Sequence, residues 1–317
     1  MDARWGKKFV NKRDWKEINE EYVVRGEFFL DLNWVCSWDE ELKKMNKEKR
    51  GAPFEFPESL IQLQAVWGQW VNYRGLEGIT RKLHENKLVP KYNDFSTIYR
   101  RVIKIDTDFE LPLDKNISVA TDGSGISMCK GGTYRERKYG KIRRKYIKVT
   151  ISADPIKKNL LDCEVSIEGE GNSEPDIAIN HLENLIKEGF SINKFFGDGS
   201  FDKRGLFNLL DKYSIQSCIK IRSSATKERD PYSVSRNKEV KAFLKQGYKK
   251  WAKVRKYGIR WNLEGIFSSV KRIFGENIRA SKIKNMMIEI KRRFWVYQRI
   301  NNYAKCNGSL NKYIYAT

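Results

Sequence analysis

Two kinds of apolar periodicity divide the chain into a helical front part and a middle part of strands and helices. Residues 58–105 show three patterns in which apolar side chains return every three or four positions. They predict helices over Ser59–Trp70, Arg74–Asn86 and Phe95–Ile105, with Ser59 and Asp94 capping the first and the third.

Residues 115–221 alternate between short apolar runs and amphipathic stretches. The runs predict strands at Asn116–Ala120, Tyr146–Ile151, Asp162–Ile167, Lys194–Phe196 and Ile215–Ile221, with helices at Asp176–Gly189 and Lys203–Tyr213. Three strands, a helix, a strand, a helix, a strand and then a long helix is the order of a ribonuclease H-like α/β fold. In that fold a mixed sheet is flanked by helices.

The charge of the chain indicates what these elements bind. Its 317 residues carry 62 Lys and Arg against 40 Asp and Glu, a formal net charge of +22. Such an excess predicts a polyanionic partner, most often nucleic acid. No run of about 18 apolar residues could span a bilayer, and the first residues are polar, so we expect no membrane partner and no signal peptide. Five scattered cysteines without CxxC spacing predict no zinc site and a reducing cytosol. With DNA as the partner, we expect a cytoplasmic, nucleoid-associated protein.

Pattern and charge together predict three regions. Residues 1–56 form an N-terminal region that ends in a linker rich in Gly and Pro. Residues 57–112 form an all-helical, helix-turn-helix-like DNA-binding region, in which Arg100 and Arg101 lie away from the apolar face of the last helix. A plain helical packing domain is the alternative for this region. Residues 113–317 form the ribonuclease H-like domain.

Two aspartates follow short apolar runs, Asp122 in TDGSGI and Asp198 in GDGSFD. Ligand sites of open α/β sheets lie at the carboxyl ends of strands, so we expect both side chains at one edge of the sheet. Taken singly, an Asp–Gly pair is as typical of an ordinary turn.

The stretch Tyr257–Lys271 adds a third carboxylate, Glu264. If the stretch is one helix, Tyr257, Arg260 and Lys271 lie within about 40° of Glu264 around the axis, beside an apolar stripe. The stripe consists of Leu263, Ile266, Phe267, Val270 and Phe274. A surface helix with an Arg260–Glu264 ion pair is the alternative. Three carboxylates of this kind are typical ligands of two divalent cations.

The motifs TDGSGI, GDGSFD and YGIRWNLEGIFSSVK resemble those of the DDE transposases of bacterial and archaeal insertion sequences, whose signature is Y-x2-R-x3-E-x6-K. The resemblance extends from roughly Pro57 to Phe274. It implies a ribonuclease H-like fold, and it implies that a homodimer moves an element by cut and paste. The DNA partners would be terminal inverted repeats and target DNA.

The resemblance also assigns roles to residues. Asp122, Asp198 and Glu264 are implied to be catalytic and to bind Mg²⁺ or Mn²⁺, as two ions. Tyr257, Arg260 and Lys271 are implied to bind DNA near the cleaved end.

Some further residues have roles that the sequence alone leaves open. Arg143, Arg144 and Lys145 lie in a basic loop that favours phosphate contact, with a solvated hairpin as the alternative. Asp202 is expected to cap the helix that follows it. His84 and His181 are lone histidines without a Ser or Cys triad pattern, so neither is expected to be catalytic.

Two other functions fit the same elements. One is a structure-selective DNA nuclease or resolvase on the same fold. The other is a domesticated DNA-binding protein that no longer cuts, and the three intact carboxylates argue against it.

Overall fold

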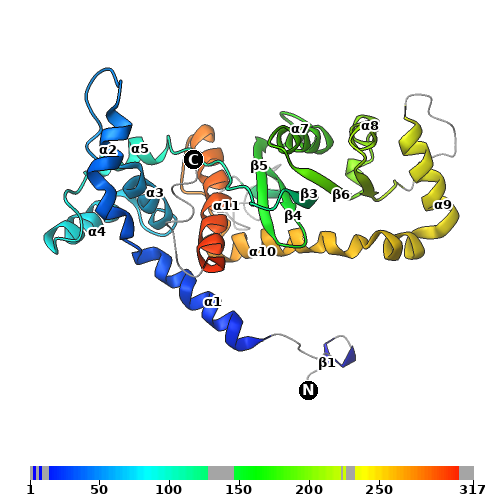
Figure 1. The fold of residues 1–317 in the computed structure, drawn as a ribbon, viewed down its shortest axis with the longest axis horizontal. Coiled ribbons are helices and arrows are strands. Elements are labelled where there is room, and N and C mark those ends of the chain that lie inside the picture. Colours follow the sequence, from blue (N-terminus) through cyan, green and yellow to red (C-terminus); the bar gives the residue numbers. More distant parts are fainter. Residues whose placement is uncertain are drawn as a thin grey trace, which may run out of the picture. The chain divides into compact units, whose positions relative to one another are not determined.

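The computed structural model describes residues 14–127, 146–222, 224–225 and 233–306, together with the backbones of two short strands, β1 (Ala3–Arg4) and β2 (Lys7–Lys8). The chain divides into two compact units, one formed by residues 1–105 with 299–317 and the other by residues 106–298 (Figure 1). Each unit buries apolar residues of its own. None of the helices in the described ranges combines the length and the apolar character that a bilayer crossing requires.

The first unit is helical. Its elements are α1 (Trp15–Glu27), the 3-10 turns η1 (Phe28–Leu30) and η2 (Asn33–Ser37), α2 (Trp38–Asn46), α3 (Glu58–Trp67), α4 (Tyr73–Glu85) and α5 (Phe95–Val102). The last three confirm the helices predicted over residues 58–105. Almost every residue of α3 is buried, and α4 and α5 both bury an apolar face, so α3 is the central helix of this unit.

The two predicted helix caps have different outcomes. Asp94 caps α5 as predicted, because its Oδ1 accepts hydrogen bonds from the backbone N–H groups of Ser96 and Thr97 at 2.8 and 3.1 Å. The prediction for Ser59 is wrong, since α3 already begins at Glu58. Glu41 of α2 accepts the N–H of Ser59 at 2.9 Å and its hydroxyl at 2.7 Å, so a carboxylate distant in sequence satisfies this helix end.

The second unit contains a five-stranded mixed sheet. Its strands are β3 (Asn116–Ser127), β4 (Tyr146–Asp154), β5 (Asn159–Ile167), β6 (Ser191–Gly197) and β7 (Gln216–Ile219), in the order β5-β4-β3-β6-β7. The first three strands along the chain pair antiparallel, whereas β6 and β7 run parallel to β3. The predicted mixed α/β sheet and its order of strands and helices are confirmed.

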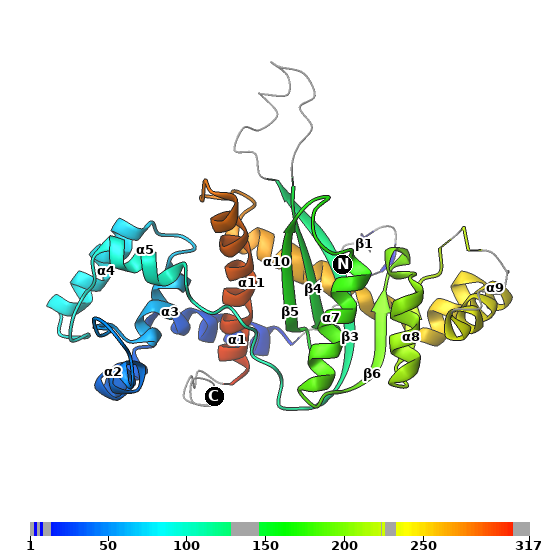
Figure 2. The same cartoon turned by 90° about the horizontal axis from the view of Figure 1, so that it is seen from above.

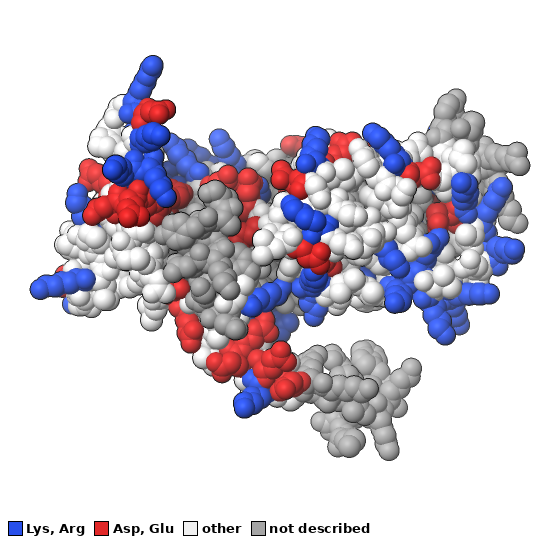
Figure 3. Space-filling view, viewed as in Figure 1, with Lys and Arg blue, Asp and Glu red and all other residues white. Residues whose placement is uncertain are grey.

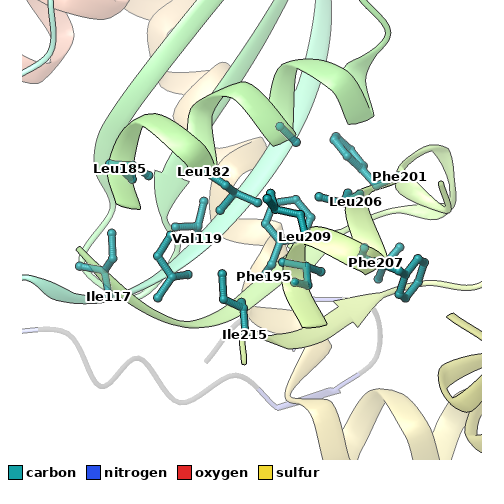
Figure 4. Close-up of a cluster of buried hydrophobic side chains, with 14 of the residues drawn as sticks. Ile117, Val119, Leu182, Leu185, Phe195, Phe201, Leu206, Phe207, Leu209 and Ile215 are labelled. Atoms are coloured by element: carbon teal, nitrogen blue, oxygen red, sulfur yellow. The ribbon is translucent and has the colours of Figure 1, made fainter. Parts of the chain in front are cut away.

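Helices flank this sheet. They are α7 (Glu174–Lys187), α8 (Arg204–Lys212), α9 (Val234–Arg255), α10 (Trp261–Phe274) and α11 (Ile283–Lys305), with the 3-10 turns η3 (Gly199–Phe201) and η4 (Tyr257–Arg260). α7 and α8 lie on one face and α10 on the other (Figure 2). Val119 and Phe195 of the sheet pack against Leu182 of α7 and Leu206 of α8 in one buried cluster (Figure 4).

β3 is longer than its apolar run predicts. Its parallel pairing with β6 ends at Ala120 and Phe196, but its antiparallel pairing with β4 continues to Ser127. The alternation of apolar residues misses this extension because the sequence there is Gly- and Ser-rich. Asp122 and Asp198 each lie two residues beyond the last paired residues of two adjacent parallel strands. The register therefore delivers both aspartates to the same edge of the sheet.

The stretch Tyr257–Lys271 is not one continuous helix, so the prediction of a single helical face is wrong. Lys256 has a left-handed backbone with φ 53° and ψ 35°, Tyr257–Arg260 forms the 3-10 turn η4, and the α-helix begins at Trp261. A 3-10 turn has three residues per turn, so Tyr257 is rotated away from the face that an α-helix would give it.

Candidate active site

Asp122 is a largely buried carboxylate at the edge of the sheet. Arg260 donates from Nη1 to its Oδ2 at 2.8 Å, and the N–H of Gly123 donates to its Oδ1 at 3.0 Å. Burial raises the pKa of the Asp122 carboxyl above its ordinary value, and the positive charge of Arg260 opposes part of that rise. The ionised carboxylate of Asp122 is therefore less stable here than in water, and a cation bound at this position would stabilise it.

Asp198 is fixed by the turn that follows it. It is the N-cap of η3, and its Oδ1 accepts from the backbone N–H of Ser200 at 2.8 Å and from the hydroxyl of Ser200 at 2.5 Å. The Gly–Ser that follows the aspartate thus orients its carboxylate, a role that the sequence pattern alone leaves open.

Glu264 reaches the same place from α10. The helix buries Leu263, Ile266, Phe267 and Val270, which confirms the predicted apolar stripe except for the half-buried Phe274, and Glu264 is half exposed in the first turn. Its Oε1 accepts from Nη2 of Arg260 at 3.3 Å. Arg260 therefore bridges Asp122 of the sheet and Glu264 of the helix.

The three carboxylates line one open groove of about 650 Å³. The residues of its wall are Asp122, Gly123, Ser124, Asp198, Arg260, Glu264, Phe267, Ser268, Lys271 and Glu276. Its acidic donors are all oxygen atoms, the type that Mg²⁺ prefers, and neither Cys nor His is among them. In the described part of the chain no three acidic, His or Cys side chains already converge on one point. The donor set therefore fits a hard cation, with side-chain rotation required to close around it.

The other residues of the predicted signature have different surroundings. Lys271 lies in the groove, where its Nζ donates to the carbonyl of Gly125 and pairs with Glu276, both at 3.3 Å. Tyr257 is buried, with its ring centroid 5.2 Å from that of Trp251, and burial raises its pKa to about 12. Trp251 is also buried, so neither ring is open to stack on a DNA base.

The remaining residues predicted to bind DNA lie elsewhere. Arg143, Arg144 and Lys145 lie outside the described residues. Arg100 is exposed on α5, with an Nη2 to Oγ distance of 3.4 Å to Ser96. Arg101 instead pairs with Glu58 at 2.7 Å and lies over the ring of Phe54, so it is engaged inside its own unit.

Asp202 and His181 have surroundings that the sequence analysis did not predict. Asp202 does not cap α8; it is buried and holds Arg236 through two bonds of 2.6 and 3.1 Å, because the first turn of α9 brings the guanidinium to it. His181 is buried on α7, where its Nδ1 lies 2.8 Å from the hydroxyl of Ser152. Ser152 is itself fully buried and so is no nucleophile for an external substrate.

Sequence reasoning missed Glu174, Ser200 and Lys148, which surround the aspartates. Glu174 pairs with Lys148 at 3.0 Å and accepts from the Ser200 hydroxyl at 2.9 Å. The sequence feature that could have indicated Glu174 was the glycine after Asp122, because a glycine allows another group to approach the backbone closely.

Among solved structures, the chain is similar to the Drosophila P element transposase strand transfer complex at 12% sequence identity. The match has a TM-score of 0.32 and covers 88% of this chain and 70% of that chain; a likeness so slight says nothing about function. None of the curated proteins compared matches the chain.

The family model described as the transposase DDE domain matches residues 99–298, more than half of the chain. The match contains Asp122, Asp198, Glu264 and Lys271. The chain belongs to the transposase DDE domain family and is a DDE transposase.

Proposed function

We propose that this transposase cleaves and joins the ends of a DNA element by cut and paste, as the transposases of bacterial and archaeal insertion sequences do. The observation that carries the proposal is the meeting of Asp122, Asp198 and Glu264 in one open groove, from two adjacent strands and a crossing helix. Transposases of this family generally depend on divalent cations, and these three carboxylates are the residues that would hold them, as two ions of Mg²⁺ or Mn²⁺.

The chemistry of the groove suits phosphoryl transfer. When bound, the ions supply charge neutralisation at the phosphate and activation of the attacking oxygen. The chain supplies positioning: β3 and β6 fix the two aspartates through the sheet register, and α10 sets Glu264 against them. The order β5-β4-β3-β6-β7, with helices on both faces, supports a ribonuclease H-like catalytic domain, and the compact unit that holds this sheet spans residues 106–298.

Positive side chains beside the groove favour a DNA backbone. Lys271 lies in the groove wall and Arg260 bridges two of the carboxylates, which supports the proposal that both contact phosphates near the cleaved end. Lys and Arg side chains also gather over α9, whose basic residues include Lys241, Lys245 and Lys249 (Figure 3). The loop with Arg143, Arg144 and Lys145 would add contacts of the same kind.

The helical region of residues 57–112 is proposed to recognise the inverted repeats, with residues 1–56 preceding it. Arg100 is the residue of this region that we propose as a DNA contact, because its side chain is exposed on α5.

Tyr257 is proposed to act on DNA indirectly, through Arg260, whose guanidinium carbon lies 5.8 Å from the centroid of the Tyr257 ring. A homodimer would bring two element ends and target DNA together.

An end-joining assay tests the proposal. Pre-cleaved duplex ends carrying the inverted repeats that flank the gene are incubated with target DNA and Mg²⁺, beside a branched junction of matched length. We expect joining of the ends, lost in Asp122→Asn, Asp198→Asn and Glu264→Gln. Cleavage of the junction without any joining would replace the transposase proposal with a resolvase.

A further inference from the structure

Glu174 lies on a helix that packs on the opposite face of the sheet from α10, yet it reaches the edge where the aspartates lie. It belongs to the first turn of α7, and its side chain is only 19% exposed. Lys148 of β4 pairs with its Oε1 at 3.0 Å. A counter-ion from β4 thus fixes this fourth carboxylate close to the site.

Ser200 connects Glu174 to Asp198. The hydroxyl of Ser200 lies 2.9 Å from Oε2 of Glu174 and 2.5 Å from Oδ1 of Asp198. One hydroxyl proton serves two carboxylate oxygens, so the orientation of Asp198 depends on where Glu174 stands.

Gly123 connects Glu174 to the other aspartate. A Cβ added at Gly123 would overlap Oε1 of Glu174 and would lie 3.1 Å from its Cδ. The N–H of the same glycine donates to Oδ1 of Asp122 at 3.0 Å. The carboxylate of Glu174 therefore packs directly against the backbone segment that orients Asp122.

We propose that Glu174 is a positioning residue that sets the separation of Asp122 and Asp198. It acts through Ser200 on one side and through packing on Gly123 on the other. Two metal ions in a phosphoryl-transfer site stand about 3.5–4 Å apart, and their ligands must be held within about 0.5 Å of the working geometry. The inference rests on the proposed function, since it assigns those ligands to Asp122 and Asp198.

A simpler role for Glu174 would be to stabilise α7. An acidic side chain in the first turn of a helix interacts favourably with the helix dipole. Asp176 offers a matched control, because it also lies in the first turn of α7 and forms an ion pair, with Lys203 at 2.5 Å. Asp176 bonds to Lys203 and to the hydroxyl of Ser173, but not to Ser200 or Asp122, so its removal tests the stability of this helix end alone.

Calorimetric titration of the full chain with Mg²⁺ tests the proposal, with thermal unfolding and DNA cleavage measured beside it. We expect Glu174→Ala to weaken Mg²⁺ binding by about 10–100-fold, with Ser200→Ala weakening it less and Asp176→Ala leaving it unchanged. Glu174→Gln should retain most of the affinity, because the amide keeps the volume and a bond to Ser200. Duplex binding should be unchanged in every variant.

A double substitution separates positioning from folding. Gly123→Ala alone should weaken Mg²⁺ binding strongly, because the new methyl group displaces Glu174. Adding Glu174→Ala removes the overlap, so the double variant should bind Mg²⁺ better than Gly123→Ala does. Additive losses, or a Glu174→Ala that behaves like Asp176→Ala, would overturn the positioning role.

The outcomes distinguish this inference from the function on which it rests. Wild-type cleavage and joining with unchanged metal affinity in Glu174→Ala would leave the transposase proposal standing and remove the positioning role. If Glu174→Ala weakens Mg²⁺ binding but the wild-type chain joins no ends, the positioning role stands and the transposition proposal falls. A wild-type chain that binds no Mg²⁺ would overturn both.

Discussion

Arg260 donates to Asp122 across 2.8 Å, which joins the helix side of the groove to the sheet side. Both side chains are largely buried, with 12% and 16% of their surface exposed. A charge left in such a place without its partner is strongly disfavoured. The ion pair is therefore structural as well as adjacent to the chemistry.

Arg260→Ala should lower the free energy of unfolding by about 1–3 kcal/mol, since it leaves a buried carboxylate without its charged donor. Urea unfolding in the presence of a chelator measures this. In the Asp122→Asn background the same substitution should cost clearly less, because no buried charge remains to be compensated. Equal losses in the two backgrounds would mean that the pair contributes nothing to stability.

The raised pKa of Asp122 predicts a pH dependence of stability. Burial, its main cause, makes the folded protein retain this proton to a higher pH than the unfolded chain does. The folded state then binds more protons between the two pKa values, so stability falls as pH rises through that window and stays lower above it. Asp122→Asn cannot ionise, so without divalent cations this decline with rising pH should be missing from the variant, whatever stability it loses at every pH by leaving Arg260 unpaired. Urea unfolding from pH 4 to pH 8 tests this, and a decline of equal size in Asp122→Asn would contradict it.

The lowered pKa of His181 predicts that stability changes with pH in the opposite direction. Burial lowers its pKa, so the folded protein takes up this proton only at a pH below the value of about 6.5 typical of the unfolded chain. Stability from this group is present above that value and is lost as pH falls below it. His181→Gln should lose about 1 kcal/mol at pH 8, from its bond to Ser152, but should lose less on acidification.

The only other histidine provides the control for this measurement. His84 is exposed, so His84→Gln should keep the wild-type decline between pH 7 and pH 5. A decline that disappears in His84→Gln and persists in His181→Gln would contradict the assignment.

The arginines of α5 should separate into two roles. Arg101→Ala removes the pair with Glu58 and the contact with the Phe54 ring, so it should destabilise the first unit by about 1 kcal/mol. Arg100→Ala should leave stability unchanged and, if this residue contacts a phosphate, lower the salt slope of DNA binding by about 0.9. Fluorescence anisotropy at several salt concentrations, with element-end and random duplexes, reports whether Arg100 also contributes discrimination.

The carboxylate groove was predictable from the sequence because local patterns define each part of it. Apolar runs predict β3 and β6, and parallel register then places Asp122 and Asp198 at one edge. The spacing of Leu263, Ile266 and Val270 predicts the buried side of α10 and with it the direction of Glu264.

Features set by tertiary contacts were not predictable in this way. The break before Trp261 depends on one left-handed residue, Lys256, and a lysine rarely adopts that conformation, so the sequence does not indicate it. Glu174 looks like an ordinary first-turn residue until the fold brings Gly123 and Ser200 to it. Arg101 has the exposed spacing of a DNA contact, yet a glutamate from α3 holds it.

Lys271 separates DNA positioning from metal binding. Its Nζ contacts the carbonyl of Gly125 and the carboxylate of Glu276, and none of the three carboxylates assigned to metal. Lys271→Ala should therefore keep Mg²⁺ affinity and thermal stability. End joining should fall by about 100-fold, because a phosphate held in the wrong register is attacked poorly. The exposed neighbour Arg272 is the matched control, since Arg272→Ala removes one positive charge from the same turn without touching the groove. Loss of Mg²⁺ binding in Lys271→Ala, or an equal loss of joining in Arg272→Ala, would show that Lys271 contributes only to structure or to overall charge.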